Sequence, residues 1–418
     1  MRHHRLSWII AAAIAVASFI PVPAAAADTS ARAAAPADAT TPAVVKHVTT
    51  DVDGDGTRDS VTLTYLGADQ FTLGVTTTRG RTSTVSFGSA FEAIYPYTPN
   101  VAWYGASAID GRKGSELIVR VPTTKSTVPG GPLAVYTWRS GTLVKETAPP
   151  SPWGRAWNVD TGNDLRAAGY RFFTSHGHRY VDATRMTSTG KGSAPWKGII
   201  TRSVWRHGTW VKVSTRKAKA VRIGNDLTWG QVGIAGPRLL LGQLNVDISG
   251  DGAPDLVLLY RTGARSFQAR VSANGHVASA VVFPGYPDWD PFIGAAEVDG
   301  VAGREILAVT DGGDAFEWKV LGWRNNALVE VPGPLATRWF VDSDEDEVNF
   351  ALSSESGSHY VVVAVTEWGH YAGQPVHFGR FVWSVGHWTM QSAWDDVLTP
   401  EQAAAFRSGF TAPDLVSP

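Results

Sequence analysis

The feature that most restricts the fold of this chain is an acidic nine-residue segment that occurs twice. Asp51–Asp59 has aspartates at its positions 1, 3, 5 and 9, and Asp247–Asp255 repeats the pattern 247 − 51 = 196 residues later. Each copy precedes a run with the character of a β-strand, such as Ser60–Tyr65 after the first. A match over this separation indicates that the chain is a tandem duplication of a long unit.

Other matching segments keep the two copies aligned. Gly105–Val119 corresponds to Gly294–Ala308, and the aspartates of their Asp-Gly turns are 299 − 110 = 189 residues apart. A further signature, an aromatic strand followed by a short turn and a second strand, occurs four times. Its tryptophans are Trp138, Trp205, Trp323 and Trp383, where 323 − 138 = 185 and 383 − 205 = 178.

The duplication predicts an all-β fold in two halves, 45–216 and 217–395, each with three β units. We expect the six units at 45–90, 91–150, 151–216, 217–286, 287–333 and 334–395. One unit cannot bury both faces of its own sheet, so units must pack on one another. Packing around a common axis hides the sheet edges, which predicts a six-bladed β-propeller. Two separate domains of three units each are the alternative.

The two ends of the chain are expected to lie outside the repeats. Residues 1–27 combine a basic start, the apolar run Trp8–Ile20 and small residues before Asp28, which predicts a signal peptide and therefore a secreted protein. A retained membrane anchor is the alternative. Residues 28–44 are rich in Ala, Thr and Pro and predict a disordered linker. The tail 396–418 is expected to contain a short capped helix.

Composition narrows the possible partners and cofactors. The chain has no cysteine, so disulfides cannot stabilise it and it has no thiol nucleophile. Its formal net charge is −1, from 37 basic and 38 acidic residues, which gives no reason to expect nucleic acid or an anionic membrane as a partner. After removal of the signal peptide we expect no membrane insertion. The 17 tryptophans and 43 glycines are typical of turn-rich β proteins.

The acidic segment has the residues of a calcium-binding loop. Calcium is a hard cation that takes six to eight oxygen ligands, and alternate residues of a tight loop can direct oxygens to one point. Glycines at positions 4 and 6 let the chain curl, because glycine tolerates positive φ. A solvated turn is the alternative. The predicted Ca²⁺ ligands are the carboxylates of Asp51, Asp53, Asp55 and Asp59 and the backbone carbonyl of Thr57.

The second segment lacks one of these carboxylates. Ser249 stands at position 3, so this loop has one negative charge fewer and is expected to bind calcium more weakly. Its predicted metal positions are Asp247, Ser249, Asp251, Ala253 and Asp255.

Other polar clusters have two interpretations each. Asp110 with Glu116, and Asp299 with Glu305, could form shortened metal loops, but we favour Asp-Gly turns in which the glutamate accepts backbone N–H bonds. The segment 342–346 could bind metal or form a solvated acidic turn, and the turn is favoured. The histidines at 176 and 178 could hold a transition metal, but they flank a glycine, so a turn is favoured here too.

Three aromatic segments resemble surface loops: Tyr95–Tyr97, Tyr286–Pro291 and Glu367–Gly373. Exposed aromatic rings can stack on sugars or anchor protein partners. Packing between blades is the alternative, and we favour it for each segment.

The acidic loops, together with Phe87-Gly88 upstream of Gly105-Ala106-Ser107, resemble the FG-GAP/VCBS repeats of integrin-α-like propellers. The resemblance covers most of residues 45–333 and is specific at the two acidic loops. It implies a calcium-stabilised β-propeller with a role in adhesion or ligand binding. It also implies that the ten loop positions named above are the calcium ligands.

The sequence therefore predicts a secreted, non-catalytic, calcium-binding propeller that binds an extracellular glycan or protein. It contains no Gly-x-Ser-x-Gly elbow, no zinc helix and no phosphate loop. The alternative function is a secreted glycan hydrolase or lyase with its site in the propeller funnel, since paired acids can be distant in sequence. A purely structural exported module is a third possibility.

Overall fold

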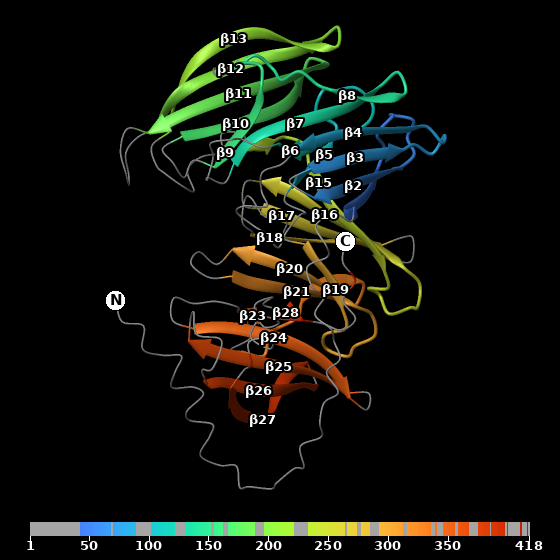
Figure 1. Ribbon diagram of the computed structural model, residues 1–418, viewed down its shortest axis with the longest axis vertical. Coiled ribbons are helices and arrows are strands. Elements are labelled where there is room, and N and C mark those ends of the chain that lie inside the picture. Colours follow the sequence, from blue (N-terminus) through green and yellow to red (C-terminus); the bar gives the residue numbers. More distant parts are fainter. Residues whose placement is uncertain are drawn as a thin grey trace. The chain divides into compact units, whose positions relative to one another are not determined.

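The computed structural model describes most of the chain from residue 42 onward (Figure 1). The described ranges are 42–67, 70–88, 102–121, 130–151, 154–161, 166–188, 196–220, 233–263, 266–273, 277–284, 292–311, 316–335, 339–340, 346–355, 358–367, 375–384, 386–397, 399, 410–411 and 416. Within them the secondary structure consists of strands and turns with no α-helix, which confirms the all-β prediction. No helix there could span a membrane. The predicted signal peptide, nearly all of the predicted linker and the predicted C-terminal helix lie outside these residues.

The first half contains three groups of antiparallel strands in chain order. Group 1 is β1 (Ala43–Thr50), β2 (Asp59–Gly67), β3 (Gln70–Thr76) and β4 (Thr82–Gly88). Group 2 is β5 (Trp103–Ser107), β6 (Glu116–Arg120), β7 (Gly130–Arg139) and β8 (Thr142–Lys145), followed by β9 (Trp157–Thr161). Group 3 is β10 (Arg166–Ser175), β11 (His178–Ser188), β12 (Trp196–Arg206) and β13 (Thr209–Ala220).

The second half repeats this arrangement. Group 4 is β15 (Leu239–Val246), β16 (Asp255–Gly263), β17 (Ser266–Ala273) and β18 (Val277–Pro284), preceded by β14 (Ile234–Ala235). Group 5 is β19 (Phe292–Ala296), β20 (Glu305–Asp311), β21 (Phe316–Arg324) and β22 (Ala327–Glu330), followed by β23 (Trp339–Phe340). Group 6 is β24 (Asp346–Glu355), β25 (Ser358–Glu367), β26 (Pro375–Ser384) and β27 (His387–Val397), with β28 (Phe410–Thr411).

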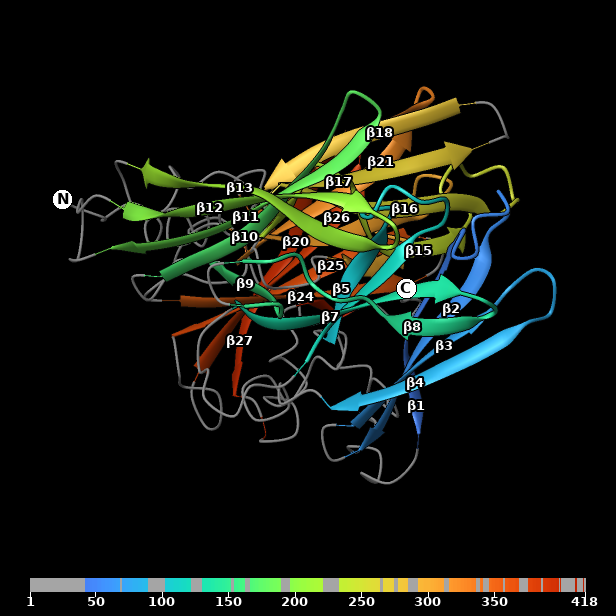
Figure 2. The ribbon, with the colours of Figure 1, turned by 90° about the horizontal axis from the view of Figure 1, so that it is seen from above.

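Several of these groups are joined by further pairings. Groups 2, 3 and 4 form one 14-stranded sheet. Twelve of its strands follow the order β13-β12-β11-β10-β9-β7-β6-β5-β15-β16-β17-β18, and β14 and β8 pair with β10 and β7 beside this path. Groups 1, 5 and 6 form sheets of four, five and five strands. Almost all the pairings are antiparallel; β14 with β10 and β28 with β24 are parallel. Figure 2 shows β10–β13 side by side with their twist.

The two halves share the irregularities of their strand pairing. A β-bulge inserts an extra residue into one strand, so its position is a sensitive marker of register. Corresponding register shifts occur at Val44/Lys46 and Leu240/Gly242, at Tyr65/Gly67 and Arg261/Gly263, at Trp103/Gly105 and Phe292/Gly294, and at Arg202/Ser203 and Arg380/Phe381. A shift in the first half and its counterpart in the second half are 196 residues apart in the first two cases, 189 in the third and 178 in the fourth. These are the offsets already seen in the sequence.

All four predicted aromatic hairpins are present. In each, the tryptophan lies directly opposite the apolar residue five positions later, because two turn residues separate the strands at a tight reversal. The opposed pairs are Trp138 with Leu143, Trp205 with Trp210, Trp323 with Leu328, and Trp383 with Trp388.

The buried cores lie between successive groups of strands. One apolar cluster joins groups 1 and 2, the next joins groups 2 and 3, and their counterparts join groups 4 and 5 and groups 5 and 6. Each group therefore buries its apolar side chains mainly against its neighbour in the chain. Buried members of these clusters from the two groups are, for example, Leu73 and Leu117, Val135 and Phe172, Phe267 and Leu321, and Val320 and Phe350.

Candidate metal sites

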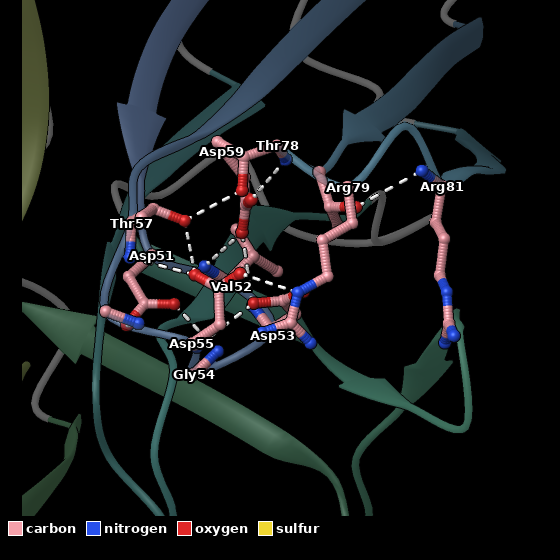
Figure 3. A network of polar contacts seen from close by, with 12 residues as sticks. Asp51, Val52, Asp53, Gly54, Asp55, Thr57, Asp59, Thr78, Arg79 and Arg81 are labelled. Atoms are coloured by element: carbon pink, nitrogen blue, oxygen red, sulfur yellow. Dashed lines mark hydrogen bonds and ion pairs between the residues drawn. The ribbon is translucent and has the colours of Figure 1, made fainter.

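The first acidic segment connects β1 to β2 and is closed by its last residue, Asp59 (Figure 3). Asp59 is fully buried. Its Oδ2 accepts the N–H groups of Val52 (2.8 Å) and Asp53 (3.2 Å), and its Oδ1 accepts the N–H of Thr78 at 3.0 Å. One carboxylate thus ties the start of the loop to the β3–β4 connection.

Asp51 organises the turn itself. Its Oδ1 accepts the N–H of Gly54 at 2.7 Å and its Oδ2 accepts that of Gly56 at 3.0 Å. Both glycines have positive φ, 79° and 90°, as the sequence predicts for a chain that curls around a point.

The loop brings three of the predicted ligands together. Asp51, Asp53 and Asp59 each offer a carboxylate oxygen, and these three oxygens lie within 4.8 Å of one another. Calcium binds oxygens at about 2.3–2.6 Å, so two ligands of one ion can be up to about 5 Å apart. The three carboxylates therefore could bind one metal ion, and a set of hard oxygen donors suits calcium or magnesium better than a soft metal.

The fourth predicted carboxylate, Asp55, lies outside this trio. Its Oδ1 accepts the N–H of Thr57 at 2.8 Å and also the Thr57 hydroxyl, and its Oδ2 lies 3.1 Å from Nε of Arg79. The hydrogen bonds from Thr57 lower the pKa of Asp55. Asp55 is therefore held as a carboxylate at the rim of the loop.

The second acidic segment has the same turn with fewer charges. Asp255 Oδ2 accepts the N–H groups of Ile248 (3.0 Å) and Ser249 (2.7 Å), as Asp59 does in the first copy. No three carboxylates come together here within the described part of the chain. The hydroxyl of Ser249 is buried, and none of the described residues forms a hydrogen bond with it. The remaining bonds join Asp247 to Gly250 (2.7 Å) and Gly252 (2.8 Å), and Asp251 to Ala253 (2.8 Å).

Each acidic loop packs directly on the Asp-Gly turn of the next group. The N–H of Ser115 donates to the carbonyl of Asp51 at 2.7 Å, and a Cβ on Gly114 would lie 2.4 Å from the carbonyl oxygen of Val52. Only glycine permits this approach. The second half repeats this contact. The backbone N–H of Arg304 donates to the Asp247 carbonyl at 2.9 Å, and Gly303 lies beside Ile248.

A second cluster of carboxylates is buried in group 2. Asp110, Glu116 and Glu146 are 0%, 1% and 6% exposed, and each places a carboxylate oxygen within 4.8 Å of the others. The sequence pointed to the first two as a possible shortened loop but gave no sign of Glu146. This cluster also could bind a metal ion.

The hydrogen bonds of Glu116 bear out the predicted turn. Its Oε2 accepts the N–H of Ile109 at 2.7 Å and that of Asp110 at 3.4 Å, and its Oε1 accepts the Thr137 hydroxyl at 3.1 Å. Arg139 forms an ion pair with Asp110. Burial, followed by the charge of Asp110, raises the pKa of Glu116 to about 7.

Glu146 has only half of its carboxyl group satisfied. Its Oε1 accepts the indole N–H of Trp210 at 2.9 Å, whereas Oε2 is buried and has no hydrogen-bond partner among the described residues. Burial, and then the charge of Glu116, raises the pKa of Glu146 to about 8. In the alignment of the two halves, 331 − 146 = 185 makes the apolar Val331 the counterpart of Glu146.

The second half keeps the turn without the third carboxylate. Glu305 Oε2 accepts the N–H of Val298 at 2.9 Å, and Arg324 reaches both Asp299 and Glu305, the latter at 3.2 Å. Burial and the charge of Asp299 raise the pKa of Glu305 to about 8. In this half one arginine bridges both acids.

The remaining predicted sites are only partly described. His176 lies in a turn with φ 50° and bonds to the Ser175 hydroxyl at 3.0 Å, so the turn interpretation is correct at this position. The aromatic segments 95–97 and 286–291, most of 367–373, and residues 342–345 lie outside the described part of the chain.

Comparison with known proteins identifies no family. No protein-family model and no curated protein sequence matches the chain, so its resemblance to FG-GAP/VCBS repeats stays a prediction. Among solved structures, AofleA from Arthrobotrys oligospora is 10% identical, covering 86% of this chain and 90% of that one, with a TM-score of 0.23.

Two other solved structures are similarly remote. The exotype rhamnogalacturonan lyase YesX is 10% identical over 87% of this chain and 67% of its own, with a TM-score of 0.25. The WD40 domain of SCAP from fission yeast is 11% identical over 87% and 71%, with a TM-score of 0.19. These TM-scores are too low to assign a fold or a function.

Proposed function

We propose that this chain is an exported, calcium-stabilised β-propeller that binds an extracellular glycan or protein and is not an enzyme. The observation that carries the proposal is the convergence of Asp51, Asp53 and Asp59 at the start of β2. Three like charges at one point repel one another unless a cation offsets them. Calcium is the cation whose oxygen preference and loop geometry match this donor set.

The ion would act as a structural clamp. Asp51, Asp53 and Asp59 would hold it in the first loop, with the Thr57 carbonyl and Asp55 as the further predicted ligands. The second loop, with Ser249 in place of a carboxylate, would bind more weakly. Because Ser115 donates to the Asp51 carbonyl, an ordered loop also orders the neighbouring turn of group 2.

Contacts between the first strands of the groups support a propeller. Thr49 of β1 donates to Gln243 of β15 at 3.0 Å, and Leu240 of β15 pairs with Ala106 of β5. In a propeller the first strand of each blade lies nearest the axis, so the first strands of blades that are not neighbours in the chain can meet there. We therefore propose that the six groups are six blades.

The three carboxyl groups with raised pKa values are buried, which favours a binding function over a catalytic one. A carboxyl with a raised pKa can serve as a general acid in glycan hydrolysis. Glu116, Glu146 and Glu305 have raised pKa values, but each is at most 6% exposed and cannot reach a polymer in solvent. The hydrolase or lyase alternative would need other acids.

Calcium titration by calorimetry tests the proposal. Calcium binding to the wild type should produce a measurable heat and have a dissociation constant of roughly 10⁻⁴–10⁻³ M or tighter. The Asp53→Ser variant, which gives the first loop the residue of the second, should bind several-fold more weakly. The matched control is Asp395→Ser, which removes an exposed carboxylate far from either loop in sequence. Equal affinities in all three proteins would refute the assignment of the site, and turnover of a glycan substrate would refute the non-catalytic role.

A further inference from the structure

The near-neutral net charge hides a large separation of charge between groups 3 and 6. Strands β10–β13 contain eleven Lys and Arg but one acid, 11 − 1 = +10, whereas β24–β27 contain one Arg and six acids, 1 − 6 = −5. These groups occupy equivalent places in the two halves. The lone acid of group 3, Asp182, is already engaged by Arg202 at 2.7 Å and Arg171 at 3.6 Å.

Five of the cations gather on one face of the group 3 sheet. Cross-strand partners share a face, and the register places Arg166 opposite Thr187, Thr187 opposite Lys197, and Lys197 opposite Lys219. This row crosses all four strands, which Figure 2 shows side by side. Adjacent strands are about 4.8 Å apart, so the row extends about 14 Å.

A second row runs beside the first on the same face. Ile199 lies between Arg185 and Lys217, two residues along the strands from the first row, a step of about 6.7 Å. All five cations are exposed, and no ion pair involves them within the described part of the chain. We call this set the basic surface: Arg166, Arg185, Lys197, Lys217 and Lys219.

The basic surface is the solvent-facing end of a sheet face that enters the core farther along the strands. Phe172 and Trp210, on the same face toward the other end of the strands, are buried between groups 2 and 3. Like charges directly opposite each other, such as Lys197 and Lys219, destabilise a sheet. The arrangement therefore adds no stability to the sheet itself, and it points to an anionic partner.

The second half shows that the fold does not require these cations. With the offsets 346 − 166 = 180 and 395 − 217 = 178, the five positions become Asp346, Val365, Pro375, Asp395 and Val397. None is basic. Asp395 instead pairs with the His377 imidazole at 2.5 Å. The same sheet therefore forms with the charge reversed.

We propose that the basic surface binds a linear acidic polysaccharide, which names the ligand class for the binding role proposed above and rests on that role. Two adjacent, parallel rows of cations match the repeated anionic groups of an extended chain. Arginine can pair with a carboxylate or sulfate through two parallel hydrogen bonds, and lysine acts as a point charge. Among the described residues no aromatic side chain stands in either row, whereas single-stranded nucleic acid and neutral sugars are bound largely by stacking on such rings.

The test compares dextran sulfate with uncharged dextran in calcium-containing buffer, using binding to the immobilised full-length protein. The wild type should bind the first and not the second. The triple variant Lys197→Gln, Lys217→Gln, Lys219→Gln should lose about tenfold or more in affinity, since each exposed ion pair contributes up to about a factor of five.

The matched control removes three exposed cations of the same sheet that lie off the basic surface. Arg206→Gln, Lys212→Gln, Arg216→Gln changes the net charge equally and should lose less than about threefold by screening alone. Equal losses in the two triple variants would overturn the proposal, because only net charge would then matter. Tighter binding of a single-stranded DNA 20-mer would assign the surface to nucleic acid instead.

Two further outcomes distinguish polysaccharide binding from self-association and from the calcium proposal. A salt-sensitive oligomer that the Lys197, Lys217 and Lys219 variant abolishes would show that the surface docks group 6 of a second copy, and would overturn the polysaccharide. The same variant should bind calcium as the wild type does. Calcium binding without any affinity for dextran sulfate would refute this inference alone, and the reverse result would refute only the calcium proposal.

Discussion

Trp210 donates its indole N–H to Glu146 at 2.9 Å, whereas its counterpart Trp388 donates to the backbone carbonyl of Pro332 at 2.8 Å. The two halves therefore satisfy the same buried indole in different ways. In the first half the acceptor is a buried ionisable group beside two other carboxyl groups, and in the second it is a neutral amide. The pH dependence of stability should differ accordingly.

Replacement of Glu146 by glutamine should flatten the pH dependence of unfolding. The folded pKa of Glu146, about 8, exceeds its ordinary value of 4.5, so the folded state keeps a proton that the unfolded state releases between these pH values. Wild-type stability should therefore fall as pH rises from 4.5 to 8, by up to about 1.4 kcal/mol per pH unit. Glu146→Gln keeps an acceptor for Trp210 and should match the wild type at pH 5 but exceed it at pH 9.

Urea unfolding in the presence of chelator measures this difference. The control is Glu330→Gln, because Glu330 is half exposed and pairs with Lys319 at the surface. Its curve should follow the wild type at both pH values. A Glu146→Gln protein that remains no more stable than the wild type at pH 9 would contradict the raised pKa.

Chelation should lower the melting temperature of the wild type. An ion that binds only the folded state adds RT ln(1 + [L]/Kd), about 1.4 kcal/mol per site at tenfold excess over Kd. Differential scanning calorimetry in EGTA and in millimolar calcium measures the shift. Asp53→Ser should reduce it, because one of the three converging carboxylates is lost. Identical wild-type curves in the two buffers would mean that the acidic loops are plain turns.

Addition of a carboxylate to the second loop should raise its affinity. Ser249→Asp restores the charge pattern of the first loop, and the Ser249 hydroxyl oxygen is buried without a partner in the loop that Asp247 and Asp255 form. Calorimetry should show a second calcium site that tightens by several-fold. Without calcium the same variant should be less stable than the wild type, since it adds a negative charge to the loop.

Gly114→Ala should destabilise the protein through a clash rather than through backbone strain alone. Its φ is +99°, and a Cβ there would lie 2.4 Å from the Val52 carbonyl oxygen. Gly80→Ala is the matched control, because Gly80 has φ +75° and an added Cβ there would have no atom within 4 Å. Backbone strain alone should lower the stability of this control by about 1 kcal/mol. We expect the loss in Gly114→Ala to be larger by about 1–3 kcal/mol in urea unfolding. Equal losses would show that the loop and the turn are not in contact in solution.

Local patterns allowed much of the fold to be predicted. The hairpins around Trp138 and Trp205, and the curled loop at 51–59, each depend on residues close together in sequence, whose spacing determines the turn. The convergence of Asp51, Asp53 and Asp59 follows from the same local spacing. Asp55 was expected to join them but instead bonds to Thr57 and Arg79, and the distant arginine could not be anticipated.

Long-range pairing explains what the sequence did not indicate. Glu146 joins Asp110 only because β7 and β8 fold back on the turn, and nothing in its neighbouring residues marks it. The basic surface unites Arg166 with Lys219 across three strand pairings, and the net charge of −1 gave no sign of it. Both features depend on tertiary contacts rather than on local pattern.

The shared bulges have a consequence for how the two copies could diverge. One extra residue inside a strand turns every later side chain to the opposite face, so a strand cannot change length without exposing its core. The separation of equivalent residues falls from 196 to 189, 185, 180 and finally 178, as in 380 − 202, and each step falls in a connection between strands. Within the described residues, the differences in length between the two halves are thus confined to the connections. Those connections are where an inserted epitope or reporter peptide should be accepted without loss of the fold.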